Sequence, residues 1–174
     1  MREGGENASY SREFAFSKST GRPAVLNTKP NDSYTFEGAS LLVDGYHSRP
    51  VFTSGAWLGY LDEPLDVTID MGGEQSYRSV ELETLAEKGD WIFPPSSVTV
   101  WVSDNGTDFT EVASVSVPEA KAGDADGIGR YRMQFPETSA RYLKVVAQNA
   151  AAIPAWHPGA GSKGFLFVDE IVVE

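Results

Sequence analysis

A period-two alternation of apolar and polar side chains is the feature that most constrains this chain. In residues 65–71, for example, Leu65, Val67, Ile69 and Met71 alternate with polar residues. Period two places successive side chains on opposite faces of a β-strand. The same alternation recurs at 80–83, 98–102 and 130–135, and denser apolar runs lie at 141–147 and 165–173. With no apolar stripe of helical spacing over three turns, we predict an all-β sandwich of roughly eight strands.

The length of 174 residues suits one domain with a short tail. Residues 1–20 are polar, with Phe14 and Phe16 as anchors, and are predicted to be a tail or linker. Residues 21–174 are predicted to form the domain. Because the N-terminus has no apolar core of a signal peptide, we expect a piece cut from a larger exported protein.

Charge restricts the partners. The net charge is −11 and the pI is near 4.6. The 14 Lys and Arg residues never form a basic run, so nucleic acid and anionic membranes are disfavoured as partners. Neutral sugars remain compatible. The absence of cysteine excludes a disulfide framework and a zinc–thiolate site.

Three long segments between the predicted strands, 44–60, 86–96 and 148–164, hold both histidines and three of the four tryptophans. Long loops in a compact domain are usually functional or disordered, and this aromatic content argues against disorder. We therefore predict that these loops carry the function.

The four tryptophans are expected to have different roles. Trp57 is predicted to be a core residue, and Trp101 to face away from the valines of its strand. Trp91 and Trp156 stand in loops rich in Gly and Pro, where an indole either anchors the loop or offers a platform for a sugar. A pyranose stacks its C–H face on an aromatic ring and needs a few polar groups around it. The predicted polar groups are those of Tyr46, His47, Arg49 and His157.

Recognisable catalytic chemistry is missing from the sequence: it has no HExxH, nucleophile elbow or triad pattern. The run 159–164 has the spacing G-x-G-x-x-G but lacks the strand–helix context of a dinucleotide site. The run 124–127 opens like a calcium loop but has Phe135 where a bidentate acid is required. We therefore predict a non-catalytic domain.

Four motifs occur in an order typical of a known family. They are Leu42-Val43-Asp44-Gly45, Ser103-Asp104-Asn105-Gly106, Ala140-Arg141-Tyr142-Leu143-Lys144-Val145 and Val168-Asp169-Glu170-Ile171. Together they resemble the coagulation factor V/VIII type C, or discoidin, domain over residues 22–174. The resemblance implies a discoidin-like, eight-stranded antiparallel jelly-roll β-sandwich.

Two loop motifs, 91–94 and 153–161, suggest a subtype. They resemble the discoidin-like C-terminal domains of bacterial β-N-acetylhexosaminidases (chitobiases), akin to carbohydrate-binding module family 32. This resemblance implies that catalysis resides in a neighbouring domain of the same chain, in a glycoside hydrolase exported from a bacterium.

The resemblance also implies a structural calcium ion, held by Asp44, Glu170 and backbone carbonyls. Tyr46 replaces the Asn that usually follows the Asp-Gly pair. Alternatively, Asp44 accepts backbone N–H groups within its own turn, as Asp often does. Both interpretations stay open at this stage.

The sequence as a whole predicts a carbohydrate-binding accessory module. Its loops 44–50, 88–95 and 154–163 are expected to gather at one end of the sandwich and bind a terminal sugar. The alternative is an interaction domain that uses the same aromatic loops to pack on the parent's catalytic domain without sugar affinity. Phospholipid binding is a third interpretation, which the acidic charge disfavours.

Overall fold

The computed structural model describes residues 12–174 and contains, within them, nine strands and four short 3-10 helices. The strands are β1 (Glu13–Phe14), β2 (Ala24–Leu26), β3 (Tyr46–His47), β4 (Leu58–Tyr60), β5 (Leu65–Ala86), β6 (Ser97–Ser103), β7 (Thr110–Ser116), β8 (Gly127–Gln148) and β9 (Leu166–Val173). The helices are η1 (Asp32–Tyr34), η2 (Gly38–Val43), η3 (Phe52–Ser54) and η4 (Lys88–Asp90).

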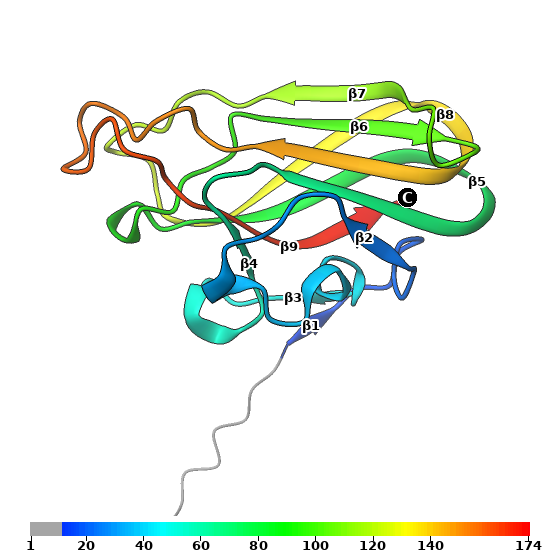
Figure 1. Ribbon diagram of the computed structural model, residues 1–174, viewed down its shortest axis with the longest axis horizontal. Coiled ribbons are helices and arrows are strands. Elements are labelled where there is room, and N and C mark those ends of the chain that lie inside the picture. Colours follow the sequence, from blue (N-terminus) through cyan, green and yellow to red (C-terminus); the bar gives the residue numbers. More distant parts are fainter. Residues whose placement is uncertain (1–11) are drawn as a thin grey trace, which may run out of the picture.

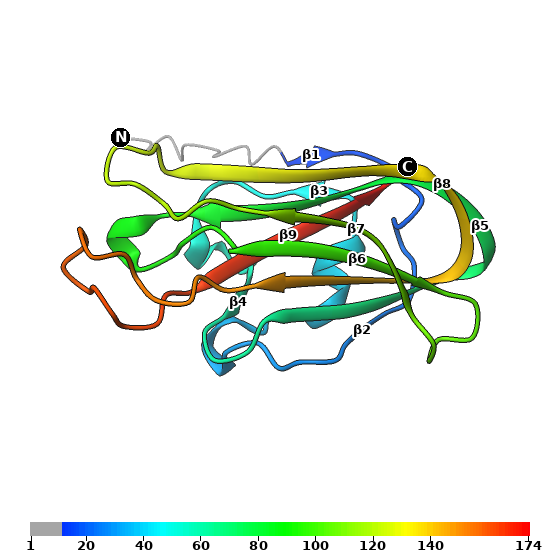
Figure 2. The same ribbon diagram turned by 90° about the horizontal axis from the view of Figure 1, so that it is seen from above.

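Seven of the nine described strands form two antiparallel layers, which are visible in Figures 1 and 2, while β1 and β3 form a separate two-stranded sheet. One layer has the order β2, first half of β5, second half of β8, β6 and β7. The other has the order β4, β9, second half of β5 and first half of β8. The predicted all-β sandwich is therefore confirmed.

β5 and β8 each run through both layers, and their pairing changes register between Asp70 and Gln75 and again between Tyr77 and Ser79. The sequence indicated separate strands at 65–71 and 80–83, because the alternation stops at the two glycines between them. Gly72 has a φ of 80°, and its N–H donates to Asp70 Oδ1 at 2.9 Å. The chain bends at this point while its pairing with β8 continues, so the two expected strands are halves of one.

The inward rows of both layers form the core. It includes Val67, Ile69, Val98, Val100, Leu143 and Val145 from one layer and Leu58, Val80, Leu82, Met133, Val168 and Ile171 from the other. Trp57 is fully buried in a second cluster with Leu85, Ile92 and Phe167. The predicted core role of Trp57 is thereby confirmed.

Part of the segment predicted as a tail packs on the sandwich. β1 pairs with β3, the N–H of Lys18 donates to the Val173 carbonyl at 3.0 Å, and Ser19 Oγ donates to the Ile171 carbonyl at 2.6 Å. The rest of that segment, residues 1–11, lies outside the described residues. Within residues 12–174, none of the helices has the length and apolar content needed to cross a lipid bilayer.

Leu82 supplies a direct test of the central position of β5. We expect Leu82→Ala to lower the free energy of unfolding by about 2–5 kcal/mol. The truncated side chain leaves a cavity that the strands β8 and β9, paired on either side of β5, cannot close. Chemical denaturation measures the change. Val25→Ala on β2, where the side chain is exposed, is the control and should cost no more than about 0.5 kcal/mol. Equal losses for the two variants would contradict the assigned core.

Candidate functional site

Four rings meet at one end of the sandwich, where the segments 86–96 and 148–164 lie together (Figure 1). The His157 ring lies 6.2 Å from Trp91, 5.5 Å from Phe93 and 5.5 Å from Trp156, between ring centroids. We call these four residues the aromatic end cluster. The two loops are joined by backbone bonds between Phe165 and the carbonyl of Trp91 and between Phe93 and the carbonyl of Phe165.

His157 is the buried centre of this cluster, with 8% of its surface exposed. Its Nε2–H donates to the Lys88 carbonyl at 2.9 Å, and its Nδ1 accepts the Gly159 N–H at 3.0 Å. These two bonds select the Nε2–H tautomer and occupy both ring nitrogens. The sequence suggested His157 as a direct sugar contact, whereas its bonds in the structure hold the two loops and their indoles in place.

Trp91 is 42% exposed and has a left-handed backbone, with φ at 64°. Such a conformation is costly for a bulky residue and persists only where the surroundings enforce it. The surroundings here include Gly159, where an added Cβ would lie 2.8 Å from the Trp91 ring. A glycine at this position therefore lets the indole lie directly on the backbone of the facing loop.

Trp156 is 39% exposed and ties its loop to a third segment. Its Nε1–H donates to the Ala120 carbonyl at 2.9 Å, and its ring lies 6.4 Å from that of Phe93. The hydrogen bond fixes the orientation of the indole while part of its surface stays open to solvent.

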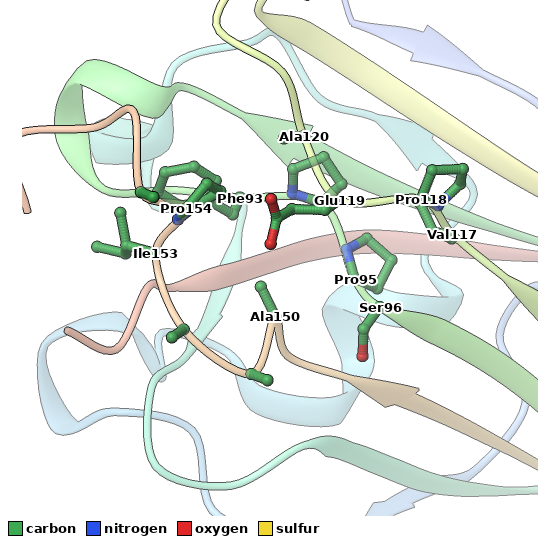
Figure 3. A pocket seen from close by; sticks show the side chains of 14 residues that line it. Phe93, Pro95, Ser96, Val117, Pro118, Glu119, Ala120, Ala150, Ile153 and Pro154 are labelled. Carbon is green, nitrogen blue, oxygen red and sulfur yellow. The ribbon is translucent and has the colours of Figure 1, made fainter. Parts of the chain in front are cut away.

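An apolar pocket of about 390 Å³ is lined in part by Ala120, whose carbonyl accepts the Trp156 hydrogen bond, and we call it the end pocket (Figure 3). Its walls are formed by Phe93, Pro94, Pro95, Ser96, Val117, Pro118, Glu119, Ala120, Ala150, Ala151, Ala152, Ile153, Pro154 and Ala155. Among these residues Glu119 has the one charged side chain, and Figure 3 shows it pointing into the hollow. The pocket therefore suits a ligand with apolar faces that is neutral or cationic where it meets Glu119.

Sequence reasoning missed most of this pocket. The alanines and prolines carry no chemistry that marks them individually, and Glu119 lies 37 residues from Trp156 in the chain. The one available signal was the run Asn149-Ala150-Ala151-Ala152-Ile153-Pro154, an apolar stretch of small residues between a strand and a proline.

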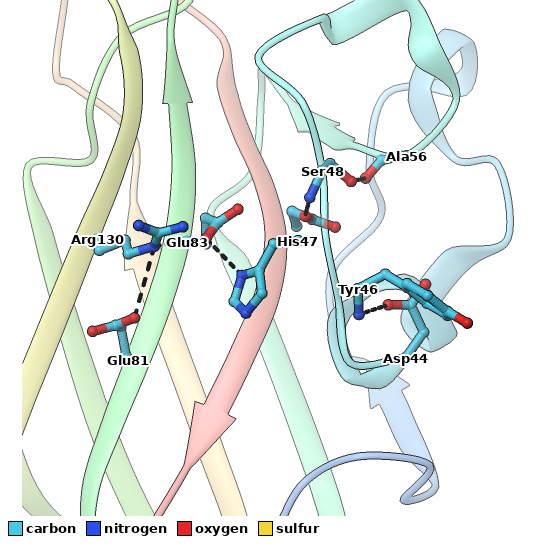
Figure 4. A network of polar contacts seen from close by, with 9 residues as sticks. Asp44, Tyr46, His47, Ser48, Ala56, Glu81, Glu83 and Arg130 are labelled. Atoms are coloured by element: carbon cyan, nitrogen blue, oxygen red, sulfur yellow. Dashed lines mark hydrogen bonds and ion pairs between the residues drawn. The ribbon is translucent and has the colours of Figure 1, made fainter. Parts of the chain in front are cut away.

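In the third loop expected at this site, 44–50, the strand β3 lies elsewhere, because it pairs with β1 on another side of the molecule (Figures 1 and 2). His47 points inward, and its Nδ1–H donates to Glu83 Oε2 at 2.8 Å (Figure 4). The same oxygen accepts Arg130 Nε–H at 2.9 Å. The expected gathering of three loops therefore fails for Tyr46 and His47, which strand pairing places beside β1, whereas Pro50 at the end of the same loop lines a hollow with Ala86 and Glu87.

Tyr46 and Arg49 share this separate location. The Tyr46 ring packs edge-on against Phe14, 5.1 Å between centroids, and the Arg12 guanidinium lies 5.1 Å from the same ring. Arg49 lines a different hollow, together with Asp44 and Ser48.

The two expected calcium ligands lie among buried carboxylates next to β3. Glu170 is fully buried, and neither of its carboxylate oxygens has a hydrogen-bond partner among the described residues. Burial and the charges of Asp44 and Asp169 raise the pKa of Glu170 to about 9, and burial raises the pKa of Asp169 to about 7. Partnerless buried oxygens of this kind suit a hard cation.

Asp44 also accepts a backbone N–H group within its own turn, which was the alternative prediction for this residue. Its Oδ1 accepts the Tyr46 N–H at 2.7 Å (Figure 4), and burial raises its pKa. Residues 12–174 contain no group of three or more metal-ligating side chains. A cation at this place would therefore need Asp44, Glu170 and backbone carbonyls together, which is the ligand type that calcium accepts.

Comparison with known proteins identifies a family with this architecture. The F5/8 type C domain family matches residues 26–164. A comparison with curated protein sequences finds no match.

Solved structures with the same fold include a chitosan-binding module of a chitosanase/glucanase from Paenibacillus sp. IK-5, at 17% identity and a TM-score of 0.59, covering 92% of this chain and 99% of that one. A Clostridium perfringens module in complex with GalNAc-β-1,3-galactose has 16% identity and a TM-score of 0.55, covering 87% and 93%. A Streptococcus pneumoniae fucose-binding module has 20% identity and a TM-score of 0.55, covering 91% and 94%. At these identities the likeness concerns the fold. The family match, which spans most of the chain, settles the membership: this chain belongs to the F5/8 type C domain family.

Proposed function

We propose that this domain is a non-catalytic carbohydrate-binding module whose site is the aromatic end cluster and the end pocket beside it. The observation that carries the proposal is the pair of indoles, Trp91 and Trp156, which are part-exposed yet fixed in place around a buried His157. Rigid aromatic surfaces at the protein–water boundary bind the C–H face of a pyranose with little loss of conformational freedom.

The chemistry of the end pocket limits the class of sugar that fits it. Glu119 can accept hydrogen bonds from hydroxyl or ammonium groups, and no cation lines the pocket among the described residues. The net charge of −11 also repels anionic sugars. Neutral or amine-bearing sugars therefore fit this site better than uronic acids or sulfated sugars.

The similar solved structures support the proposal by what they bind: one binds chitosan, one was solved with GalNAc-β-1,3-galactose and one binds fucose. The first derives from a chitosanase/glucanase. By analogy, this domain would serve an exported bacterial glycoside hydrolase and bind a terminal sugar of its substrate. The loop motifs 91–94 and 153–161 favour a chitobiase-like parent.

A second candidate function rests on a separate surface. Phe14 and Tyr46 are both exposed and pack against each other on the strands β1 and β3. An exposed aromatic pair of this kind suits contact with a neighbouring domain. It lies away from the aromatic end cluster, so a domain contact there is compatible with sugar binding.

Trp156→Ala tests the proposed site. We expect at least about a tenfold loss of affinity, because the stacking surface disappears while the fold remains. Isothermal calorimetry with glucosamine oligosaccharides, GalNAc-β-1,3-galactose and fucose measures it. Phe16→Ala removes a ring that is 81% exposed but lies on the N-terminal segment, and should leave affinity unchanged. If no sugar binds the wild type at millimolar concentration, the proposal fails.

Gly159→Ala tests how Trp91 is positioned. The added methyl would displace the Trp91 ring, so we expect weaker sugar binding and a changed tryptophan fluorescence. The double variant Gly159→Ala/Trp91→Ala should bind sugar as weakly as Trp91→Ala alone, because both changes act on one indole. Gly123→Ala, at a site with open space around the added Cβ, is the control. Additive losses in the double variant would contradict this mechanism.

Calcium binding is the remaining proposal, with Asp44, Glu170 and backbone carbonyls as ligands. Without a cation, the folded state holds a proton on Glu170 up to a pH of about 9, whereas the unfolded chain releases it near the ordinary pKa of 4.5. The stability of the metal-free protein should therefore fall as the pH rises from about 5 to 9. Calcium replaces that proton, so its stabilising effect should grow over the same range.

Thermal melts with EDTA or millimolar calcium, at pH 5.5 and pH 8, measure both effects. We expect calcium to raise the melting temperature more at pH 8. Glu170→Gln should abolish the calcium response and flatten the pH dependence, whereas Glu111→Gln, at an exposed position on β7, should change neither. An unchanged wild-type melting temperature in calcium at pH 8 would refute the site.

A further inference from the structure

A second hollow, of about 470 Å³, lies on the outer surface of the layer that contains β6 and β8. We call it the sheet-face hollow. It is lined by Asp66, Thr99, Trp101, Thr107, Phe109, Lys144, Val146 and Gln148. Neither the family match nor the aromatic end cluster accounts for it.

Strand alternation puts these side chains on one surface. Val98, Val100 and Val102 of β6 are buried in the core, so Thr99 and Trp101 face outward. Across the ladder, Thr99 is opposite Val146 and Trp101 is opposite Lys144. The floor of the hollow is therefore a row of half-buried apolar and polar side chains on an otherwise solvent-facing sheet.

The wall of the hollow is a tightly bonded turn. Asn105 Oδ1 accepts the N–H groups of Thr107 and Asp108, both at 2.9 Å. The turn returns the chain to the sheet at Phe109, whose ring centroid lies 4.5 Å from Lys144 Nζ. Phe109 and Trp101 thus present two aromatic side chains in one hollow.

Charge and polarity favour a neutral, hydroxyl-rich ligand. Lys144 Nζ lies 4.0 Å from Asp66 Oδ1, so the cation and the anion of the hollow offset each other. Thr99, Thr107 and Gln148 add hydroxyl and amide groups that can donate and accept hydrogen bonds. Aromatic surface interspersed with such groups matches a sugar ring.

The sheet-face hollow and the end pocket are lined by residues that lie close together along the same two strands. Gln148, the last residue of β8, lines the hollow, and Ala150 lines the end pocket. On the neighbouring strand, Thr99 lines the hollow and Ser96 lines the end pocket. Three residues of a strand span only about 10 Å, so one extended ligand can occupy both places.

We propose that the outer face of β6 and β8 binds further units of a linear, neutral or amine-bearing oligosaccharide whose end occupies the end pocket. This inference rests on the proposed function and extends it from a terminal sugar to a chain of several units. Trp101 is its central contact.

Calorimetry with β-1,4-linked glucosamine and N-acetylglucosamine oligosaccharides of one to six units tests the inference. For the wild type, we expect affinity to rise at least tenfold from the monosaccharide to the tetrasaccharide. Trp101→Ala should keep the monosaccharide affinity and lose the gain with length, and Trp101→Phe should restore part of that gain. Val25→Ala, on the edge strand β2 of the same layer, is the matched control, and thermal melts verify that each variant folds.

Affinity that does not depend on chain length, or a gain that Trp101→Ala leaves intact, would overturn the extended site. If Trp156→Ala still weakened monosaccharide binding in that case, the proposed function would stand. If none of these oligosaccharides bound the wild type, the extended site would fall together with the proposed use of the end pocket for such sugars.

Discussion

The pairing of β5 with β8 through both layers is the constraint on which the rest of the structure depends. Both strands pass from one layer to the other, so their bend sets the separation of the layers and the position of every neighbouring strand. The bend requires a residue that tolerates a positive φ, which Gly72 supplies. Because the inward rows on both halves of β5 and β8 are apolar, the bend buries them against each other rather than against solvent.

Two buried polar residues, His157 and Glu170, lie on this frame, and they differ in whether their polar atoms have hydrogen-bond partners. At the end of the sandwich, His157 has a partner for each ring nitrogen and holds two indoles in place. Beside β3, Glu170 is buried without a partner, and its pKa rises because a charge there has no compensation. Every polar atom of the His157 ring is hydrogen-bonded, so its role is structural. By contrast, the carboxylate oxygens of Glu170 have no partner among the described residues, and the proposed calcium ion would supply one.

The proposed binding surface follows from where the sandwich leaves aromatic side chains uncovered. Trp91 and Trp156 stand at the end of the sandwich in the aromatic end cluster, and Trp101 stands on the outer sheet face in the sheet-face hollow. The side chains around them are mostly small, apolar or neutral and polar, with Glu119 in the end pocket and the ion pair of Lys144 and Asp66 in the sheet-face hollow. Such a surface offers stacking and hydrogen bonds to a neutral or amine-bearing sugar, as the proposed function requires.

The sequence by itself determined the sandwich, the core role of Trp57 and the two loops that carry Trp91 and Trp156, because strand periodicity and Gly/Pro punctuation are local signals. Only the tertiary structure decided that β3 carries Tyr46 and His47 away from those loops, and that Glu119 faces the end pocket. It also decided that His157 is buried and that Trp101 shares a hollow with Phe109 and Lys144. These outcomes depend on pairings between residues far apart in the chain, and no local pattern in one sequence encodes which distant strands will pair.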